Sequence, residues 1–166
     1  MAKRTPIAIA VAVLLTAAAA ILATDIAMPI PASAHEDHGS FSAGEPGDPK
    51  KPARVVLVTM RESDGKMMFI PDKVEVRKGE QIRFMLRNSG LLEHEFLLAT
   101  TEENLKHAEL MKKFPDMEHD EPNGKRLKPN GASEVVWRFT KAGTFEYGCL
   151  IPGHREAGMT GTVIVK

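Results

Sequence analysis

The sequence contains a single cysteine, Cys149, among its 166 residues. A lone thiol cannot close an intramolecular disulfide, so packing, reactivity or metal ligation must account for it. The chain also lacks an excess of charge of either sign, with 22 basic and 22 acidic residues. No block of like charge stands out, which argues against nucleic acid and bulk anionic membrane as partners.

Long apolar runs are also scarce, and the longest lies at the N-terminus. Lys3 and Arg4 precede an apolar run over residues 7–23, and Ala32-Ser33-Ala34 follows it. This order predicts a secretory signal peptide over residues 1–34 that is cleaved after Ala34, and hence a periplasmic protein. The alternative is an uncleaved membrane anchor, because the run is close to the roughly 17-residue lower limit for spanning a bilayer. Its alanine content and the cleavage site favour removal, which would leave no stable membrane insertion.

The segment after the expected cleavage site, residues 35–53, is rich in Gly, Pro, Ser, Asp and Glu. Phe41 is almost its only apolar residue, so it cannot bury enough surface to order itself. We therefore expect a flexible leader that contains His35 and His38. Residues 54–166 are enough for a single core, and we expect one domain there.

Short β-like runs recur between turn signals in this domain. The expected strands are Val55–Met60, Met67–Ile70, Val74–Arg77, Gln81–Arg87, His94–Ala99, Glu134–Thr140, Thr144–Cys149 and Thr160–Val165. Gly, Pro, Asn and Asp separate them. Many short strands with such turns predict an all-β fold, either a sandwich or a barrel.

One segment, residues 100–131, breaks the β pattern. Thr100 followed three residues later by Glu103 is the capping-box arrangement at a helix start. The residues that follow, up to about Phe114, are good helix formers, and Pro115 ends them. The rest of the segment is polar and rich in turn residues. We therefore expect a helix-plus-loop insertion between two strands of the sandwich.

The region around the only cysteine carries the chemical signal. Cys149 is followed by His154 and Met159, on the loop between two expected strands. Thiolate, imidazole and thioether are donors that together suit copper, with a second histidine expected from elsewhere. Pro152 and two glycines would let this loop fold tightly around one ion.

His94 is the best candidate for that second histidine. It begins an expected strand, whereas His35, His38, His107 and His119 all lie in the leader or the insertion. A histidine at a strand end can meet a cysteine at the same end of the opposite sheet. The residues therefore predict a mononuclear copper site built from His94, Cys149, His154 and Met159.

The chain resembles the cupredoxins, the blue-copper family that includes plastocyanin and azurin. The resemblance covers about residues 54–166, and it is carried by Gly143–Cys149, His154 and Met159 together with His94-Glu95-Phe96. It implies a Greek-key β-sandwich with His94, Cys149 and His154 as equatorial ligands and Met159 as the axial one. It also implies one-electron transfer, with His154 near the surface as the exit.

Two departures from the familiar pattern refine this expectation. Glu95 lies at the position where the family often has asparagine, a residue that helps to hold the cysteine loop in place. Such contacts tune the metal, so the sequence is compatible with either a blue or a green copper centre. The second departure is the insertion at 100–131 together with the histidine-containing leader. Both resemble small exported cupredoxins associated with copper tolerance.

Two further groups are weaker metal candidates. His107 and Met111 are four residues apart on the expected helix and share a face, and Met117 and His119 follow its end. Together they could bind a second, weaker copper, or Met111 could simply pack inward beneath a solvated His107. His35 and His38 could hold a divalent ion at the mature N-terminus, or belong to a polar tail.

These features lead to ranked functions. We expect a monomeric copper protein that can undergo redox chemistry and that serves copper tolerance. Its expected partners are redox proteins or copper-handling proteins. A dedicated electron shuttle between respiratory partners is the alternative. An enzyme such as a copper oxidase ranks last, because we find neither a nucleophile–base pair nor additional histidine-rich copper motifs.

Overall fold

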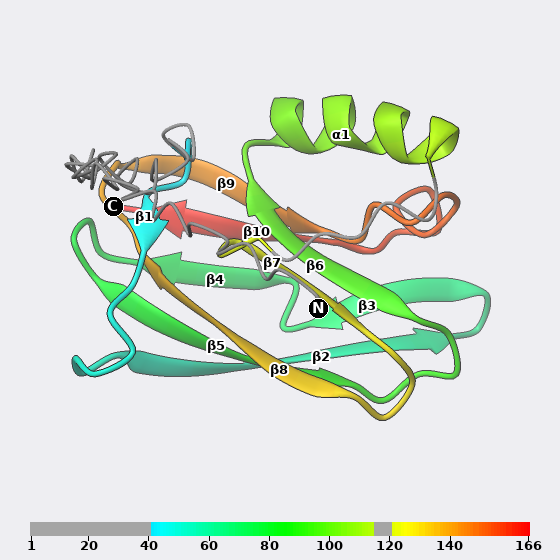
Figure 1. Ribbon diagram of the computed structural model, residues 1–166, viewed down its shortest axis with the longest axis horizontal. Helices are drawn as coiled ribbons and strands as arrows, with labels where there is room; N and C mark the ends of the chain where they lie inside the picture. The colour runs from blue at the N-terminus through cyan, green and yellow to red at the C-terminus, as the bar shows by residue number, and fades with distance from the viewer. Residues whose placement is uncertain (1–40, 115–120) are drawn as a thin grey trace, which may run out of the picture. The chain divides into compact units, whose positions relative to one another are not determined.

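A computed structural model describes residues 41–114 and 121–166 of the chain (Figure 1). The expected signal peptide, His35, His38, Met117 and His119 lie outside the described residues. No helix among the described residues is both long and apolar enough to cross a membrane.

The domain is a sandwich of two five-stranded sheets. One sheet has the order β1-β8-β5-β2-β3, with bounds Glu45–Pro46, Ala132–Arg138, Gln81–Asn88, Arg54–Ser63 and Lys66–Ile70. The other has the order β4-β10-β9-β6-β7, with bounds Lys73–Val76, Thr160–Val165, Gly143–Gly148, His94–Ala99 and Gly124–Leu127. The pairs β2–β5 and β4–β10 are parallel and the other pairs are antiparallel. This architecture confirms the predicted β-sandwich and all eight expected strands.

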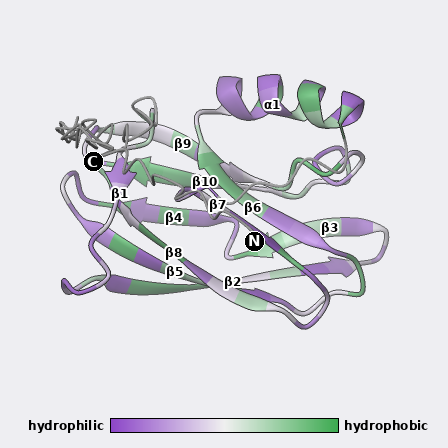
Figure 2. Ribbon diagram, in the orientation of Figure 1, coloured by the Kyte–Doolittle hydropathy of each residue, from purple (hydrophilic) through white to green (hydrophobic). Residues whose placement is uncertain are grey.

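Alternation of apolar and polar residues explains how each sheet acquires an inner face. Along β5, Ile82, Phe84 and Leu86 are buried while the residues between them are partly or fully exposed, an alternation that Figure 2 shows as changing colour. Phe84 contacts the rings of Phe96 and Tyr147 from the other sheet at centroid distances of 5.4 and 6.4 Å. The two inner faces therefore share one aromatic-rich core.

Strand β6 is buried along its whole length, because it lies between β9 and β7 and helix α1 packs over its outer face. The helix spans Thr101–Lys113 and begins with the expected capping box, in which Thr100 and Glu103 bond each other's backbone amides. This part of the expected insertion is confirmed.

The segment after the helix contains a strand that the sequence pattern does not predict. Strand β7, at Gly124–Leu127, pairs antiparallel with β6 inside the segment expected to be a loop. Its only apolar side chain is that of Leu127, so no alternation marks it in the sequence. The side of β6 that faces away from β9 supplies the backbone hydrogen bonds that make it a strand.

The leader also differs from its prediction. Residues 41–53, the described part of the segment expected to be flexible, pack onto the sandwich through β1, which pairs with β8. Ala43 is 1 % exposed and its carbonyl accepts a hydrogen bond from Trp137 Nε1 at 3.2 Å. Phe41 meets the Trp137 ring edge to face. A few contacts to one buried tryptophan thus outweigh the polar composition, and the folded domain begins before Arg54.

The aromatic core provides a stability prediction. Phe84→Ala should lower the free energy of unfolding of the copper-free protein by roughly 3–5 kcal/mol, because Phe84 is fully buried. Phe114→Ala is the matched control, since Phe114 is 58 % exposed and should change stability by about 0.5 kcal/mol or less. Urea denaturation measures both, and equal losses would contradict this account of the core.

Candidate metal centre

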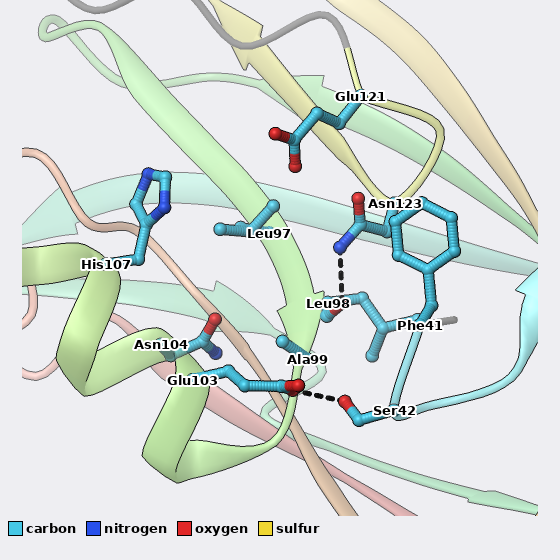
Figure 3. Close-up of a pocket in the computed structure, with 10 residues that line it drawn as sticks. All are labelled: Phe41, Ser42, Leu97, Leu98, Ala99, Glu103, Asn104, His107, Glu121 and Asn123. Carbon is cyan, nitrogen blue, oxygen red and sulfur yellow. Dashed lines mark hydrogen bonds between the residues drawn. The ribbon is translucent and has the colours of Figure 1, made fainter. Parts of the chain in front are cut away.

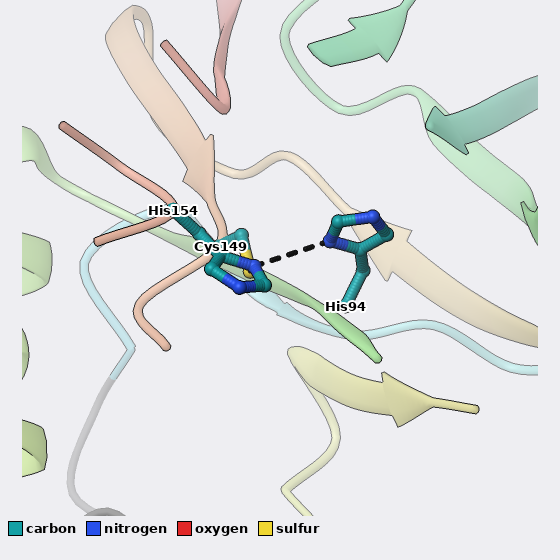
Figure 4. Close-up of side chains that lie close together, drawn as sticks. All are labelled: His94, Cys149 and His154. Atoms are coloured by element: carbon teal, nitrogen blue, oxygen red, sulfur yellow. Dashed lines mark hydrogen bonds between the residues drawn. The ribbon is translucent and has the colours of Figure 1, made fainter. Parts of the chain in front are cut away.

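Three side chains converge at one end of the sandwich (Figure 4). One ring nitrogen of His94, one of His154 and the sulfur of Cys149 all lie within 4.8 Å of one another. His94 Nδ1 is 3.2 Å from His154 Nδ1, which is in turn 3.3 Å from Cys149 Sγ. Within residues 41–114 and 121–166, no other group of three His, Cys, Asp or Glu side chains comes as close.

The pairing of β6 with β9 brings His94 to Cys149. The strands are antiparallel, with Leu97 opposite Gly148, so the start of β6 lies beside the end of β9. His94 is the first residue of β6 and Cys149 directly follows β9. The two residues therefore come from neighbouring strands of the same sheet, which corrects the expectation that they meet across opposite sheets.

The loop from Cys149 to Met159 is closed by its own backbone. The Cys149 amide donates to the Met159 carbonyl, and the Met159 amide donates to the His154 carbonyl, each at 3.1 Å. Gly153 and Gly158 have φ angles of 89° and 102°, which a residue with a side chain adopts only under strain. The expected tight loop is thus present, and its glycines are needed for its shape.

Met159 lies in the core beside the other donors. It is fully buried, belongs to the same apolar cluster as Cys149, and is hydrogen bonded through its backbone to both loop ligands. This position makes its thioether available as the fourth donor of the site. All four residues that the sequence predicted as ligands therefore belong to one buried centre.

The spacing of the donors fits a single transition-metal ion. Two nitrogens that are each about 2.0 Å from a tetrahedrally coordinated ion are about 3.3 Å apart. The observed nitrogen–nitrogen and nitrogen–sulfur separations are 3.2 and 3.3 Å. A thiolate, two imidazoles and a weak thioether form the donor set of type 1 copper sites.

Burial controls the protonation of these donors. It lowers the pKa of His94 and His154 below the usual histidine value, so both imidazoles are neutral and able to bind metal at pH 7. It raises the pKa of the Cys149 thiol to about 12, although backbone amides directed at the sulfur act in the opposite direction. One of these is the Glu95 amide, 3.3 Å from Sγ.

Glu95 occupies the position where the family often has asparagine. Its side chain is buried, and its Oε2 accepts a hydrogen bond from the Leu150 amide at 3.2 Å. The carboxylate thereby ties β6 to the residue that follows Cys149. Glu95 thus connects the strand of the first histidine to the cysteine loop, a connection that the sequence alone did not establish.

Glu62 is a site residue that the sequence analysis missed. It comes from β2, in the other sheet, and its Oε1 lies 2.8 Å from His94 Nε2. Burial alone would raise the pKa of this carboxyl, but hydrogen bonds from the backbone amides of Leu91, Leu92 and Glu62 itself and from the imidazole outweigh it and lower the pKa to about 2. No motif spacing connects Glu62 to His94, so only the fold reveals the contact.

The residues expected to form a second copper site are only partly described. Met111 is fully buried against Leu97 and Leu150, as in the packing alternative, and His107 lines a pocket of about 180 Å³ beneath α1 (Figure 3). Met117 and His119 lie outside the described residues. The second site therefore stays a prediction, as does the N-terminal site at His35 and His38.

Comparison with known proteins identifies the family of this centre. Residues 56–166 match the model of the copper binding proteins of the plastocyanin/azurin family. The chain belongs to this family. The cupredoxin resemblance is thereby confirmed, and copper is the metal of the centre.

Individual relatives agree with this assignment. The chain is 45% identical over 146 residues to the copper-resistant cuproprotein CopI of Rubrivivax gelatinosus, covering 81% of this chain and 87% of the relative. It is 31% identical to CopI of Pseudomonas aeruginosa, covering 81% and 88%. The solved structure of auracyanin B matches with a TM-score of 0.59 and 22% identity, over 77% of this chain and 99% of that one, which supports the fold.

Removal of the thiol should abolish the optical signature of the copper centre. Titration of the protein with copper should produce an intense visible thiolate-to-copper band that saturates near one equivalent. Cys149→Ala should lose this band entirely while remaining folded, because no other described cysteine exists to replace the sulfur. Retention of the band in the variant would contradict the site.

Copper binding should release a proton from Cys149. Since burial raises the pKa of the thiol to about 12, the copper-free protein keeps this proton at pH 7–10 and must lose it to form the thiolate. Roughly one proton should leave per copper, and affinity should rise about tenfold per pH unit. Calorimetry in buffers of different ionisation enthalpy measures the proton, with Cys149→Ala as the control. Binding without proton release at pH 7 would show that the thiol is already ionised.

Proposed function

We propose that the protein is an exported, periplasmic cupredoxin whose copper centre performs one-electron redox chemistry in the service of copper tolerance. The main support is its similarity to relatives named copper-resistant cuproproteins, which extends over most of both chains. The signal-peptide pattern at residues 1–34 supports export. The role is that of a metal-handling protein rather than an enzyme.

Bound copper would supply the one-electron chemistry by alternating between its cuprous and cupric states. The chain itself supplies donors whose positions are fixed before metal binds. His94 is held by Glu62, Cys149 by the Glu95 amide, and the loop ligands by their own backbone hydrogen bonds. A preformed donor set limits rearrangement when the charge of the metal changes, which favours rapid electron exchange.

The two imidazoles differ in their access to solvent. His94 is fully buried, whereas His154 lies on the surface loop and is 9 % exposed. We therefore propose that electrons enter and leave through the His154 edge, where a redox partner or copper-handling protein can approach. This geometry serves equally the alternative function, a dedicated shuttle between respiratory partners.

A deletion strain distinguishes copper tolerance from a respiratory role. Loss of the gene should lower the copper concentration that stops growth and leave respiration in copper-poor medium unchanged. The wild-type gene should restore tolerance, whereas Cys149→Ala, expressed at the same level, should not, because the variant lacks the thiolate donor. Impaired respiration with normal copper tolerance would instead support the electron-shuttle function.

A further inference from the structure

The carboxylate of Glu62 connects three groups beside the copper centre. Its Oε1 accepts from the Leu92 amide at 2.9 Å and lies 2.8 Å from His94 Nε2. Its Oε2 accepts from the Leu91 amide at 2.9 Å. Glu62 therefore holds both a metal ligand and the backbone of the loop that leads into that ligand.

The surroundings leave a defined space for this carboxylate. A Cβ atom at Gly90 would overlap the Glu62 carboxyl group, so the absence of a side chain there allows the contact. The Gly90 amide donates to Asn88 Oδ1 at 2.9 Å, and Asn88 Nδ2 donates to the Leu92 carbonyl at 2.7 Å. These bonds fix the loop in the position at which its amides point to Glu62.

The contact determines which nitrogen of His94 carries a proton. A carboxylate only accepts hydrogen bonds, so the nitrogen facing Glu62 must be Nε2–H. In the neutral imidazole Nδ1 is then bare, and Nδ1 is the atom that faces His154 and Cys149. The tautomer that binds metal is thus selected before copper arrives.

We propose that Glu62 is a positioning residue of the copper centre, which fixes the orientation and tautomer of His94 and, through its negative charge, favours the cupric over the cuprous state. A carboxylate bonded to the outer nitrogen makes the imidazole a stronger donor. Because the cupric ion carries the higher charge, a stronger imidazole donor stabilises it more than it stabilises the cuprous ion. Glu62 should therefore lower the reduction potential. This role depends on the copper centre and not on copper tolerance.

Two variants separate the charge of Glu62 from its hydrogen bond. Glu62→Gln keeps one acceptor oxygen for His94 but removes the charge, whereas Glu62→Ala removes both. Glu93→Gln is the matched control, because Glu93 is adjacent to His94 in sequence but its carboxylate pairs with Arg126. Thermal unfolding of each copper-free variant verifies that it folds.

The first measurement uses the copper-free protein. Long-range ¹H–¹⁵N NMR spectra of the imidazoles should show His94 with a protonated Nε2 and a bare Nδ1 in the wild type, Glu62→Gln and Glu93→Gln. Glu62→Ala should show a mixture of tautomers. An unchanged tautomer in folded Glu62→Ala would overturn the positioning role.

The second measurement uses the copper-loaded protein. Chelator competition should show that Glu62→Gln binds Cu(II) roughly 10- to 100-fold more weakly, with a smaller loss for Cu(I). The reduction potential should rise, by about 59 mV for each tenfold preferential loss of Cu(II) affinity. Glu93→Gln should shift it less. A potential for Glu62→Gln equal to that of the wild type, or a shift no larger than that of Glu93→Gln, would refute the charge effect.

Discussion

The antiparallel pairing of β6 with β9 is the constraint on which the copper centre depends. It places the first residue of one strand beside the residue that follows the other, so His94 and Cys149 meet at one end of the sheet. The same pairing directs the Glu95 amide at the sulfur and brings its carboxylate to the start of the cysteine loop. A shift of one residue in the register would turn the imidazole to the other face of the sheet and separate the donors.

Burial gives the centre its chemical character. The same apolar surroundings raise the pKa of the thiol and lower that of both imidazoles, so these donors carry no net charge before a metal binds. The metal ion must then provide the charge that stabilises a thiolate in the interior. The backbone amide directed at the sulfur stabilises the negative charge of the thiolate, and the Glu62 carboxylate beside His94 balances part of the positive charge of the metal. Protein groups fixed by the fold thereby replace the solvent that a metal ion would otherwise recruit.

Contacts between the two sheets complete the site. Glu62 belongs to the sheet opposite His94, and the aromatic core that joins the sheets holds their relative position. On the outer side, α1 covers β6 and buries Met111 against Leu97, so the ligand-bearing strand is enclosed from both faces. The insertion thus has a packing role on the outer face of the ligand-bearing strand, independent of any metal binding by its remaining residues.

The sequence by itself determined the donors and most of the fold. Cys149, His154 and Met159 lie within eleven consecutive residues, and this combination of donors suits copper. Alternation of apolar and polar residues predicted the strands that have one buried and one exposed face. Tertiary structure alone decided the features that depend on distant partners. Strand β7 and the packed part of the leader lack an apolar pattern and form because β6 and Trp137 offer them hydrogen bonds and contacts. Glu62 is likewise 32 residues from His94, and only the packing of one sheet on the other brings its carboxylate to the imidazole.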